Sequence, residues 1–208
     1  MDKGIASTHH QNSSAMVATV EVKYQSILPT FIDYLMPVVT IEFSAMSLED
    51  PYNEKEIITL IHSVYPDVDT EVKCLFMSVL PERTFFEKIF LLHEEYQKNN
   101  PRTKRMSRHL YDLVKIMDTP FARSALQNKV LYQSIINHRE KFNNIQGIDY
   151  RTHYPEWIQI CPPEHLVNEW ANDYRLLQQS FIYEKSKPFD ELIARLLQLT
   201  TTIREINL

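Results

Sequence analysis

Glycine is nearly absent from this chain, which has only Gly4 and Gly147 among its 208 residues. Loops that hold phosphate with backbone amides depend on glycine, because the backbone must approach the anion closely or turn with a positive φ. The sequence therefore excludes a P-loop, the dinucleotide-binding fingerprint of Rossmann folds and the glycine-rich loop of kinases.

Cysteine and long apolar runs are also scarce. Cys74 and Cys161 lie far apart and form no CxxC or histidine-rich motif, which argues against structural zinc and predicts a reducing, cytoplasmic location. The polar start of the chain lacks the apolar run of a secretory signal. No later segment approaches the roughly 18 consecutive apolar residues of a membrane span, so we expect no contact with a membrane.

The charge of the chain sets a limit on its partners. A net charge of −5 with 24% charged residues is typical of a soluble protein and provides no overall basic field for nucleic acid. Any surface that binds nucleic acid must therefore be a local basic patch.

His9 and His10 in the polar start can be read as metal ligands, but we predict a disordered tail over residues 1–15.

The apolar pattern changes character along the chain. Period-2 alternation and β-branched residues predict strands within residues 16–26, 36–45 and 71–80, the second of them more buried than the first, with a short helix around residues 57–61. Helical periodicity then predicts helices over residues 82–98, 105–117, 120–127, 128–142, 163–183 and 188–206. Strands followed by helices favour an α+β fold with a β portion over residues 16–81 and a helical domain over residues 82–208.

The stretch "RTFFEKIFLLHEEYQKNNPRTKRMSRHLYDL" carries the charges of most interest. It sets Lys88 on one predicted helix against Asp112 on the next. In the simpler interpretation, Lys88 is a surface lysine and Asp112 pairs with Arg108 one turn away. In the functional interpretation, a basic cluster around the connecting loop binds phosphate, although a solvated turn also explains it. That cluster comprises Arg102, Lys104, Arg105 and Arg108.

Several segments together resemble the nucleotidyltransferase toxins of the AbiEii/AbiGii type, within the DNA polymerase beta-like superfamily. They are "YLMPVVTIEFSAMSLEDPY", "PERTFFEKIFLLHEEY", "KRMSRHLYDL", "NHREKF" and "NDYRLLQQSFIY…FDELIARLLQL…IN". They cover the chain from about residue 17 to its end. The resemblance makes the β portion a partial nucleotidyltransferase-like sheet followed by a helical bundle.

The resemblance also implies a mechanism. Such proteins are toxins of bacterial toxin–antitoxin or phage-abortive systems, and relatives transfer nucleotides to RNA, in some cases to tRNA. The superfamily joins a 3′ hydroxyl to the α-phosphate of a nucleoside triphosphate with the help of Mg²⁺. A cognate antitoxin is the implied partner.

The family's site residues map onto this chain through the matching motifs. Lys88 matches the lysine expected near the triphosphate, and Asp112 matches the later aspartate of the same site. Glu42, on the second predicted strand, is the candidate third acidic residue and the weak metal ligand. The predicted phosphate-binding residues are Arg83, Lys104, Arg105 and Arg108.

The sequence departs from the family in the metal-binding half of the site. Family members carry a Gly-Ser pair followed by Asp-x-Asp, and this chain has neither ahead of Glu42. Its only Asp-x-Asp, Asp67 and Asp69, follows that strand in a turn-like segment that we expect to be a solvated loop. Either the chain is the carboxy-terminal part of a longer protein or it has lost catalysis.

Two functional hypotheses follow from these observations. In the first, the chain is a nucleotidyltransferase toxin, truncated or inactive alone, whose Lys88, Asp112 and Glu42 belong to one site. In the second, it is a non-catalytic helical module that binds an antitoxin or RNA. The first predicts that Lys88 and Asp112 face a common cleft although 24 residues separate them.

Overall fold

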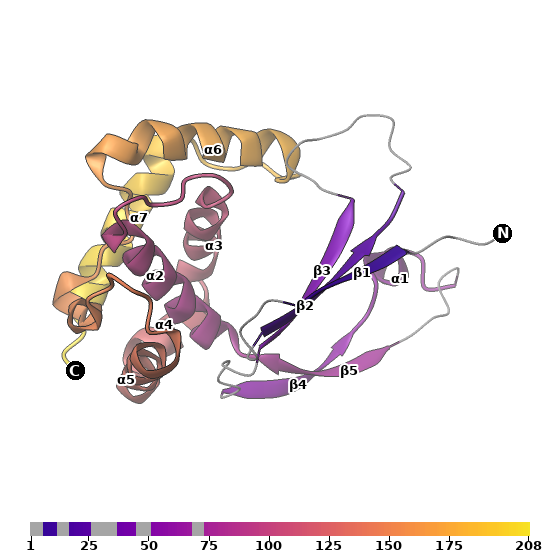
Figure 1. The fold of residues 1–208 in the computed structure, drawn as a ribbon, viewed down its shortest axis with the longest axis horizontal. Helices are drawn as coiled ribbons and strands as arrows, with labels where there is room; N and C mark the ends of the chain where they lie inside the picture. The colour runs from indigo at the N-terminus through magenta and orange to yellow at the C-terminus, as the bar shows by residue number, and fades with distance from the viewer. Residues whose placement is uncertain (1–5, 12–16, 26–36, 45–50, 68–72) are drawn as a thin grey trace.

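The computed structural model describes residues 6–11, 17–25, 37–44, 51–67 and 73–208. The strands form the amino-terminal part and the longer helices form the remainder, and the two parts lie side by side (Figure 1). The predicted α+β class is therefore confirmed.

The amino-terminal part contains two antiparallel sheets. The first has the order β1-β2-β3, built from β1 (Ala6–Gln11), β2 (Val17–Lys23) and β3 (Val38–Ser44). The second pairs β4 (Tyr52–Ile57) with β5 (Cys74–Val79). The three strands expected from the sequence correspond to β2, β3 and β5.

Two further strands, β1 and β4, were not predicted from the sequence. Within the stretch expected to be a disordered tail, Ala6–Gln11 pairs along β2, while residues 1–5 and 12–15 lie outside the described residues. The expected helix around residues 57–61 begins later, as α1 (Leu60–Val64), where the hydroxyl of Thr59 accepts a hydrogen bond from the amide of His62 at 2.9 Å. The preceding residues, up to Ile57, form β4 instead.

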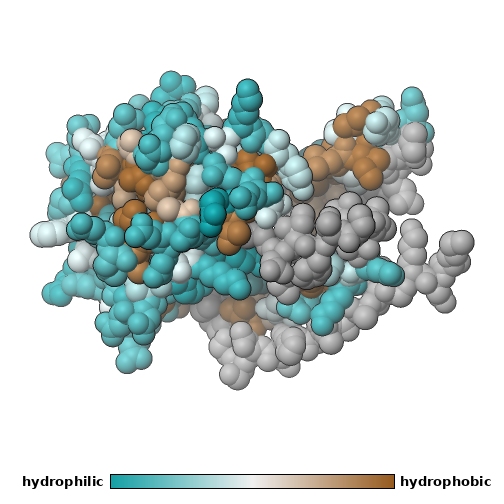
Figure 2. Space-filling model, turned by 90° about the horizontal axis from the view of Figure 1, so that it is seen from above, coloured by the Kyte–Doolittle hydropathy of each residue, from teal (hydrophilic) through white to brown (hydrophobic). Residues whose placement is uncertain are grey.

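Strand β3 is more exposed than its sequence predicts. The β-branched pattern indicates a buried strand, but β3 lies at the end of its sheet order and leaves Val39, Ile41 and Phe43 exposed. β5 likewise exposes Leu75 and Phe76. Figure 2, which views the molecule from above, shows hydrophobic surface on the strand side as well as among the polar side chains of the helical part.

The helices of the carboxy-terminal part match the predicted spans closely. They are α2 (Pro81–Gln97), α3 (Ser107–Met117), α4 (Pro120–Gln127), α5 (Lys129–His138), α6 (Val167–Ser180) and α7 (Phe189–Arg204). A π-helical segment, Arg139–Asn143, extends α5, and three short 3-10 segments lie between α5 and α6: Tyr150–His153, Pro155–Trp157 and Glu164–Leu166. Among the described residues, no helix is both long enough and apolar enough to cross a membrane.

Helix α2 is the centre of the hydrophobic core. Pro81 occupies its first turn, where the missing N–H costs no hydrogen bond. Phe85, Phe86, Ile89 and Phe90 are fully buried, and the rings of Phe86 and Phe90 both meet the edge of the Tyr132 ring from α5. Helices α3, α4 and α5 pack against α2 (Figure 1), so its charged residues lie close to the core.

Candidate nucleotide site

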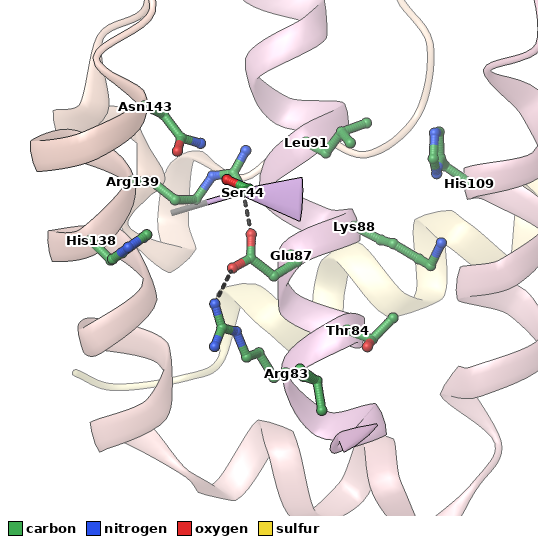
Figure 3. Close-up of a pocket in the computed structure, with 11 residues that line it drawn as sticks. Ser44, Arg83, Thr84, Glu87, Lys88, Leu91, His109, His138, Arg139 and Asn143 are labelled. Carbon is green, nitrogen blue, oxygen red and sulfur yellow. Dashed lines mark hydrogen bonds and ion pairs between the residues drawn. The ribbon is translucent and has the colours of Figure 1, made fainter. Parts of the chain in front are cut away.

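The candidate site is a pocket of about 440 Å³ along the amino-terminal half of α2. Figure 3 shows its side chains coming from α2, α3, the end of α5, the π-helical segment and the end of β3. Three permanent cations line the pocket, namely Arg83, Lys88 and Arg139, against one carboxylate, Glu87. Each of these cations is paired with a carboxylate, Arg83 and Arg139 with Glu87 and Lys88 with Asp112, so the pocket holds cationic donors in fixed orientations. Donors of this kind can contact phosphate.

The structure joins α2 and α3 through an ion pair between Lys88 and Asp112. The ammonium of Lys88 lies 2.6 Å from a carboxylate oxygen of Asp112, and the two side chains are 20% and 39% exposed. Asp112 therefore pairs across helices, and not with Arg108 as the simpler interpretation supposed. The pair lies between the α2 pocket and a second pocket that Asp112 lines, so both side chains face solvent-accessible hollows.

A histidine that the sequence reasoning did not single out lies beside this pair. His109 also lines the pocket, and its ring lies on the Lys88 side of the pocket (Figure 3). Burial, and then the neighbouring positive charge of Lys88, lowers the pKa of His109 to about 4. Its Nδ1 atom is buried and has no hydrogen-bond partner among the described residues. At neutral pH the ring is therefore uncharged.

The opposite wall of the pocket is an ion-pair network centred on Glu87. Its carboxylate accepts hydrogen bonds from Arg83 at 3.3 Å and from Arg139, as the dashed lines of Figure 3 mark. Arg139 also donates to the buried Glu94 at 2.6 and 2.7 Å, and Glu94 lies 3.1 Å from the ring of His153. Burial raises the pKa of Glu94, but the hydrogen bonds from Arg139 and His153 outweigh it and leave that pKa below its usual value.

Arg139 lies in the "NHREKF" motif, which the sequence reasoning matched to the family without assigning a role to any residue. Its guanidinium is buried, and its partner Glu94 is 45 residues away in the chain. The available sequence signal was the motif itself, because an arginine near the end of a predicted helix otherwise reads as a surface residue.

Two buried carboxylates, Glu95 and Asp173, bind the loop that carries the predicted basic cluster. Glu95 accepts hydrogen bonds from the amide and the guanidinium of Arg102, at 2.7 to 3.0 Å. Asp173 accepts hydrogen bonds from the amides of Arg105 and Ser107 and from the Ser107 hydroxyl. These hydrogen bonds cap the start of α3 and hold Arg105 at a φ of 60°. These contacts fix the loop that carries the cluster.

Only part of the predicted phosphate-binding set lies near the pocket. Arg83 lines it together with Lys88, and Arg108 lines the second pocket beside Asp112. Lys104 and Arg105 line neither of these two pockets. The geometry therefore brings Arg83 and Lys88 together and leaves Lys104 and Arg105 outside.

Glu42 lies apart from this group. It stands opposite Thr19 in the β2–β3 register, is exposed, and does not line the pocket, although Ser44 two residues later on the same strand face does. Asp67 follows α1, and Asp69 lies outside the described residues. The structure therefore does not bring Glu42 to Lys88 and Asp112.

The donor set of the described residues does not fit Mg²⁺. That part of the chain holds no group of three or more histidine, cysteine, aspartate or glutamate side chains that could surround an ion. The two carboxylates nearest the site are already engaged, Asp112 by Lys88 and Glu87 by two arginines. Mg²⁺ is usually held by one or two carboxylates plus substrate phosphates, so we assign no step of the reaction to a metal here.

Farther along α2, His93 gives the fold a pH dependence. Its ring contacts the Thr152 hydroxyl at 2.9 Å and accepts from the Gln159 amide at 3.1 Å. Burial, and then the charge of His153, lowers the pKa of His93 from 6.5 to about 4. Between these values the unfolded chain binds the proton and the folded chain does not, so stability falls as pH decreases.

We therefore expect His93 to contribute a loss of about 2 kcal/mol in the free energy of unfolding between pH 7 and pH 5. Urea unfolding at both pH values measures it. His93→Asn, whose side-chain oxygen lies near the position of Nδ1, should flatten this part of the pH dependence whatever its effect on absolute stability. An unchanged slope in that variant would show that another group titrates.

Comparison with known proteins adds a family to this geometry. The family model described as "Nucleotidyl transferase AbiEii toxin, Type IV TA system" matches residues 2–195. Searches of curated proteins and of solved structures found no match.

Proposed function

Because the chain belongs to the AbiEii nucleotidyl transferase toxin family, we propose that its α2 pocket binds the phosphates of a nucleoside triphosphate for transfer of the nucleotide to RNA, tRNA included. The observation that carries the proposal is the arrangement of Arg83, Lys88 and Arg139 around one pocket of an acidic chain. A triphosphate supplies negative charge that these cations match.

In the proposed reaction, a 3′ hydroxyl of the RNA attacks the α-phosphate and loses its proton to solvent. A new phosphodiester forms, the bond between the α- and β-phosphates breaks, and pyrophosphate leaves. The charge that develops on the phosphoryl oxygens needs nearby cations that are already oriented. Asp112 orients Lys88 through the 2.6 Å contact, and Glu87 orients Arg83 and Arg139 from the other wall. A cognate antitoxin is the proposed protein partner, as expected for a toxin–antitoxin family.

The second candidate function is a binding module without chemistry. It is favoured by the lack of the Gly-Ser and Asp-x-Asp motifs ahead of Glu42 and by the lack of a carboxylate cluster in the described part of the chain. In that case the same cationic pocket binds phosphate groups of RNA or of a nucleotide, but no labelled product forms.

Nucleotide binding by the Lys88→Ala variant tests the proposal. We expect the dissociation constant of a nucleoside triphosphate to increase about tenfold, because one charge-assisted contact to phosphate is lost. Fluorescence anisotropy with labelled ATP, GTP, CTP and UTP measures it. The matched control is Lys129→Ala, because Lys129 begins α5 whereas the pocket lies at the other end of that helix, at His138. Equal affinities in all three proteins would contradict phosphate binding at Lys88.

Transfer of label from each triphosphate to total tRNA, with Mg²⁺ present, then separates the two functions. Labelled tRNA that depends on Lys88 supports nucleotidyl transfer. Nucleotide binding without labelled tRNA, in a protein shown to be folded, supports the binding module.

A further inference from the structure

A second pocket of about 440 Å³ lies on the other side of the Lys88–Asp112 pair. Its walls are α3 and the segment that follows α6. Its lining includes Arg108, Asp112, Phe181, Tyr183 and Glu184.

The segment after α6 presents an aromatic surface to solvent. Tyr183 is 94% exposed and Phe181 is more than half exposed, whereas Ile182 between them packs against the core. The segment is held in place because Glu184 accepts hydrogen bonds from the Tyr111 hydroxyl and from Lys115, both on α3. An exposed ring on a segment anchored in this way is a surface on which a nucleic-acid base can stack, whatever its sequence.

The charge balance of this pocket favours phosphate. The negative charge of Glu184 is compensated by Lys115, and that of Asp112 by Lys88. Arg108 is exposed and pairs with no carboxylate of the described residues. One uncompensated cation therefore stands beside the aromatic surface, which is the combination that single-stranded nucleic acid binds.

The two pockets are adjacent through one ion pair. Lys88 lines the first pocket and Asp112 lines the second, 2.6 Å from the Lys88 ammonium. A nucleotide stacked on Tyr183 thus lies beside the pair that separates it from the proposed triphosphate pocket. This is the position that an acceptor end requires in a transfer reaction.

We infer that the second pocket binds the unpaired 3′-terminal nucleotides of the acceptor RNA, with a base stacked on Tyr183 and a phosphate held by Arg108. The inference rests on the proposed function, since it assigns the acceptor side of the same reaction. It goes beyond that function by giving the acceptor a location and a chemical requirement, a single-stranded end.

The test is binding of RNA to the full chain and to Tyr183 variants. The probe is a fluorescent single-stranded RNA of about 12 nucleotides, a length within the usual range of single-strand sites, compared with a blunt RNA hairpin. Tyr183→Leu is expected to weaken binding of the single strand about tenfold, while Tyr183→Phe retains the ring and stays within about twofold of the wild type. The matched control is Tyr154→Leu, an exposed tyrosine that lines neither pocket.

Arg108 gives an independent measurement. Arg108→Gln is expected to reduce the slope of log affinity against log salt by about one, because one phosphate contact disappears. An unchanged slope would overturn the assignment of Arg108, and equal RNA affinity of Tyr183→Leu and the wild type would overturn the pocket.

The experiment also separates this inference from the proposed function. Triphosphate affinity of Tyr183→Leu is expected to equal that of the wild type, because Tyr183 does not line the first pocket. RNA binding that depends on Tyr183, without triphosphate binding, would overturn the proposed function and support this site. Binding of the blunt hairpin as tightly as the single strand would overturn the requirement for an unpaired end, and loss of antitoxin binding alone in Tyr183→Leu would assign the surface to a protein partner instead.

Discussion

Glu94→Ala is expected to lower the free energy of unfolding by about 3–5 kcal/mol. The side chain is 2% exposed, and its two oxygens accept from Arg139 at 2.6 and 2.7 Å. Among the described residues, its removal leaves the buried guanidinium of Arg139 with one carboxylate partner, Glu87, which is more exposed. Since domains are commonly stable by about 5–15 kcal/mol, this one change removes a large share of the total. Urea unfolding followed by circular dichroism measures it.

Two further variants make the prediction specific to the buried charge. Glu87→Ala removes a carboxylate that also pairs with Arg139 but is 28% exposed, so we expect less than about half of the loss. The double variant Glu94→Leu/Arg139→Met removes both buried charges and should recover most of the stability that Glu94→Ala loses. A loss below about 1 kcal/mol in Glu94→Ala would show that the network does not stabilise the fold.

The same network links stability to the candidate site. Arg139 lines the pocket with one side of its guanidinium and contacts Glu94 with the other. Its position there depends on a carboxylate that lies outside the pocket lining. A variant of Glu94 that still folds is therefore expected to bind triphosphate less tightly than the wild type, without any direct contact between Glu94 and the ligand.

The helical part was predictable because each helix buries one regular stripe. In α2, Phe85, Ile89 and Leu92 recur at helical spacing, and Pro81 marks the start. The β part was less predictable since its strands are short and exposed. "YNEKEI" has no alternating apolar residues, so β4 was missed, and the β-branched run of β3 predicted burial although the strand is exposed.

The candidate site was predictable only where a motif linked distant positions. The resemblance singled out Lys88 and Asp112, and the structure places their charged groups 2.6 Å apart across two helices. It did not single out His109, whose significance lies in burial beside Lys88, or Asp173, which caps α3 from 66 residues away. Burial and long-range pairing are properties of the fold, and no local pattern records them.

Asp112→Asn is expected to reduce nucleotide transfer to RNA by about 10²- to 10³-fold while the fold remains intact. The amide keeps the shape of the carboxylate but loses the charge that holds Lys88. Because the pair is partly exposed, at 20% and 39%, its loss should cost no more than about 1 kcal/mol of stability. Rates of label transfer to tRNA, compared at equal folded concentration, measure the effect.

Asp118→Asn is the matched control for that variant. Asp118 follows α3 and is also paired across helices, with Arg195 of α7, but it does not line the α2 pocket. A similar loss of transfer in both variants would mean that charge on this part of the surface matters in general, and that Asp112 has no special role.

The double variant Lys88→Ala/Asp112→Asn decides how the pair acts. If Asp112 acts by orienting Lys88, removing Lys88 leaves it nothing to orient, and the double variant should be no slower than the slower single variant. If the two side chains contact the substrates separately, the two effects should multiply. The 2.6 Å contact favours a double variant no slower than the slower single variant, because Asp112 then acts through Lys88. Effects that multiply are expected only if Asp112 also contacts the acceptor in the second pocket. The size of the coupling therefore measures whether the ion pair works as one unit or as a link between two substrates.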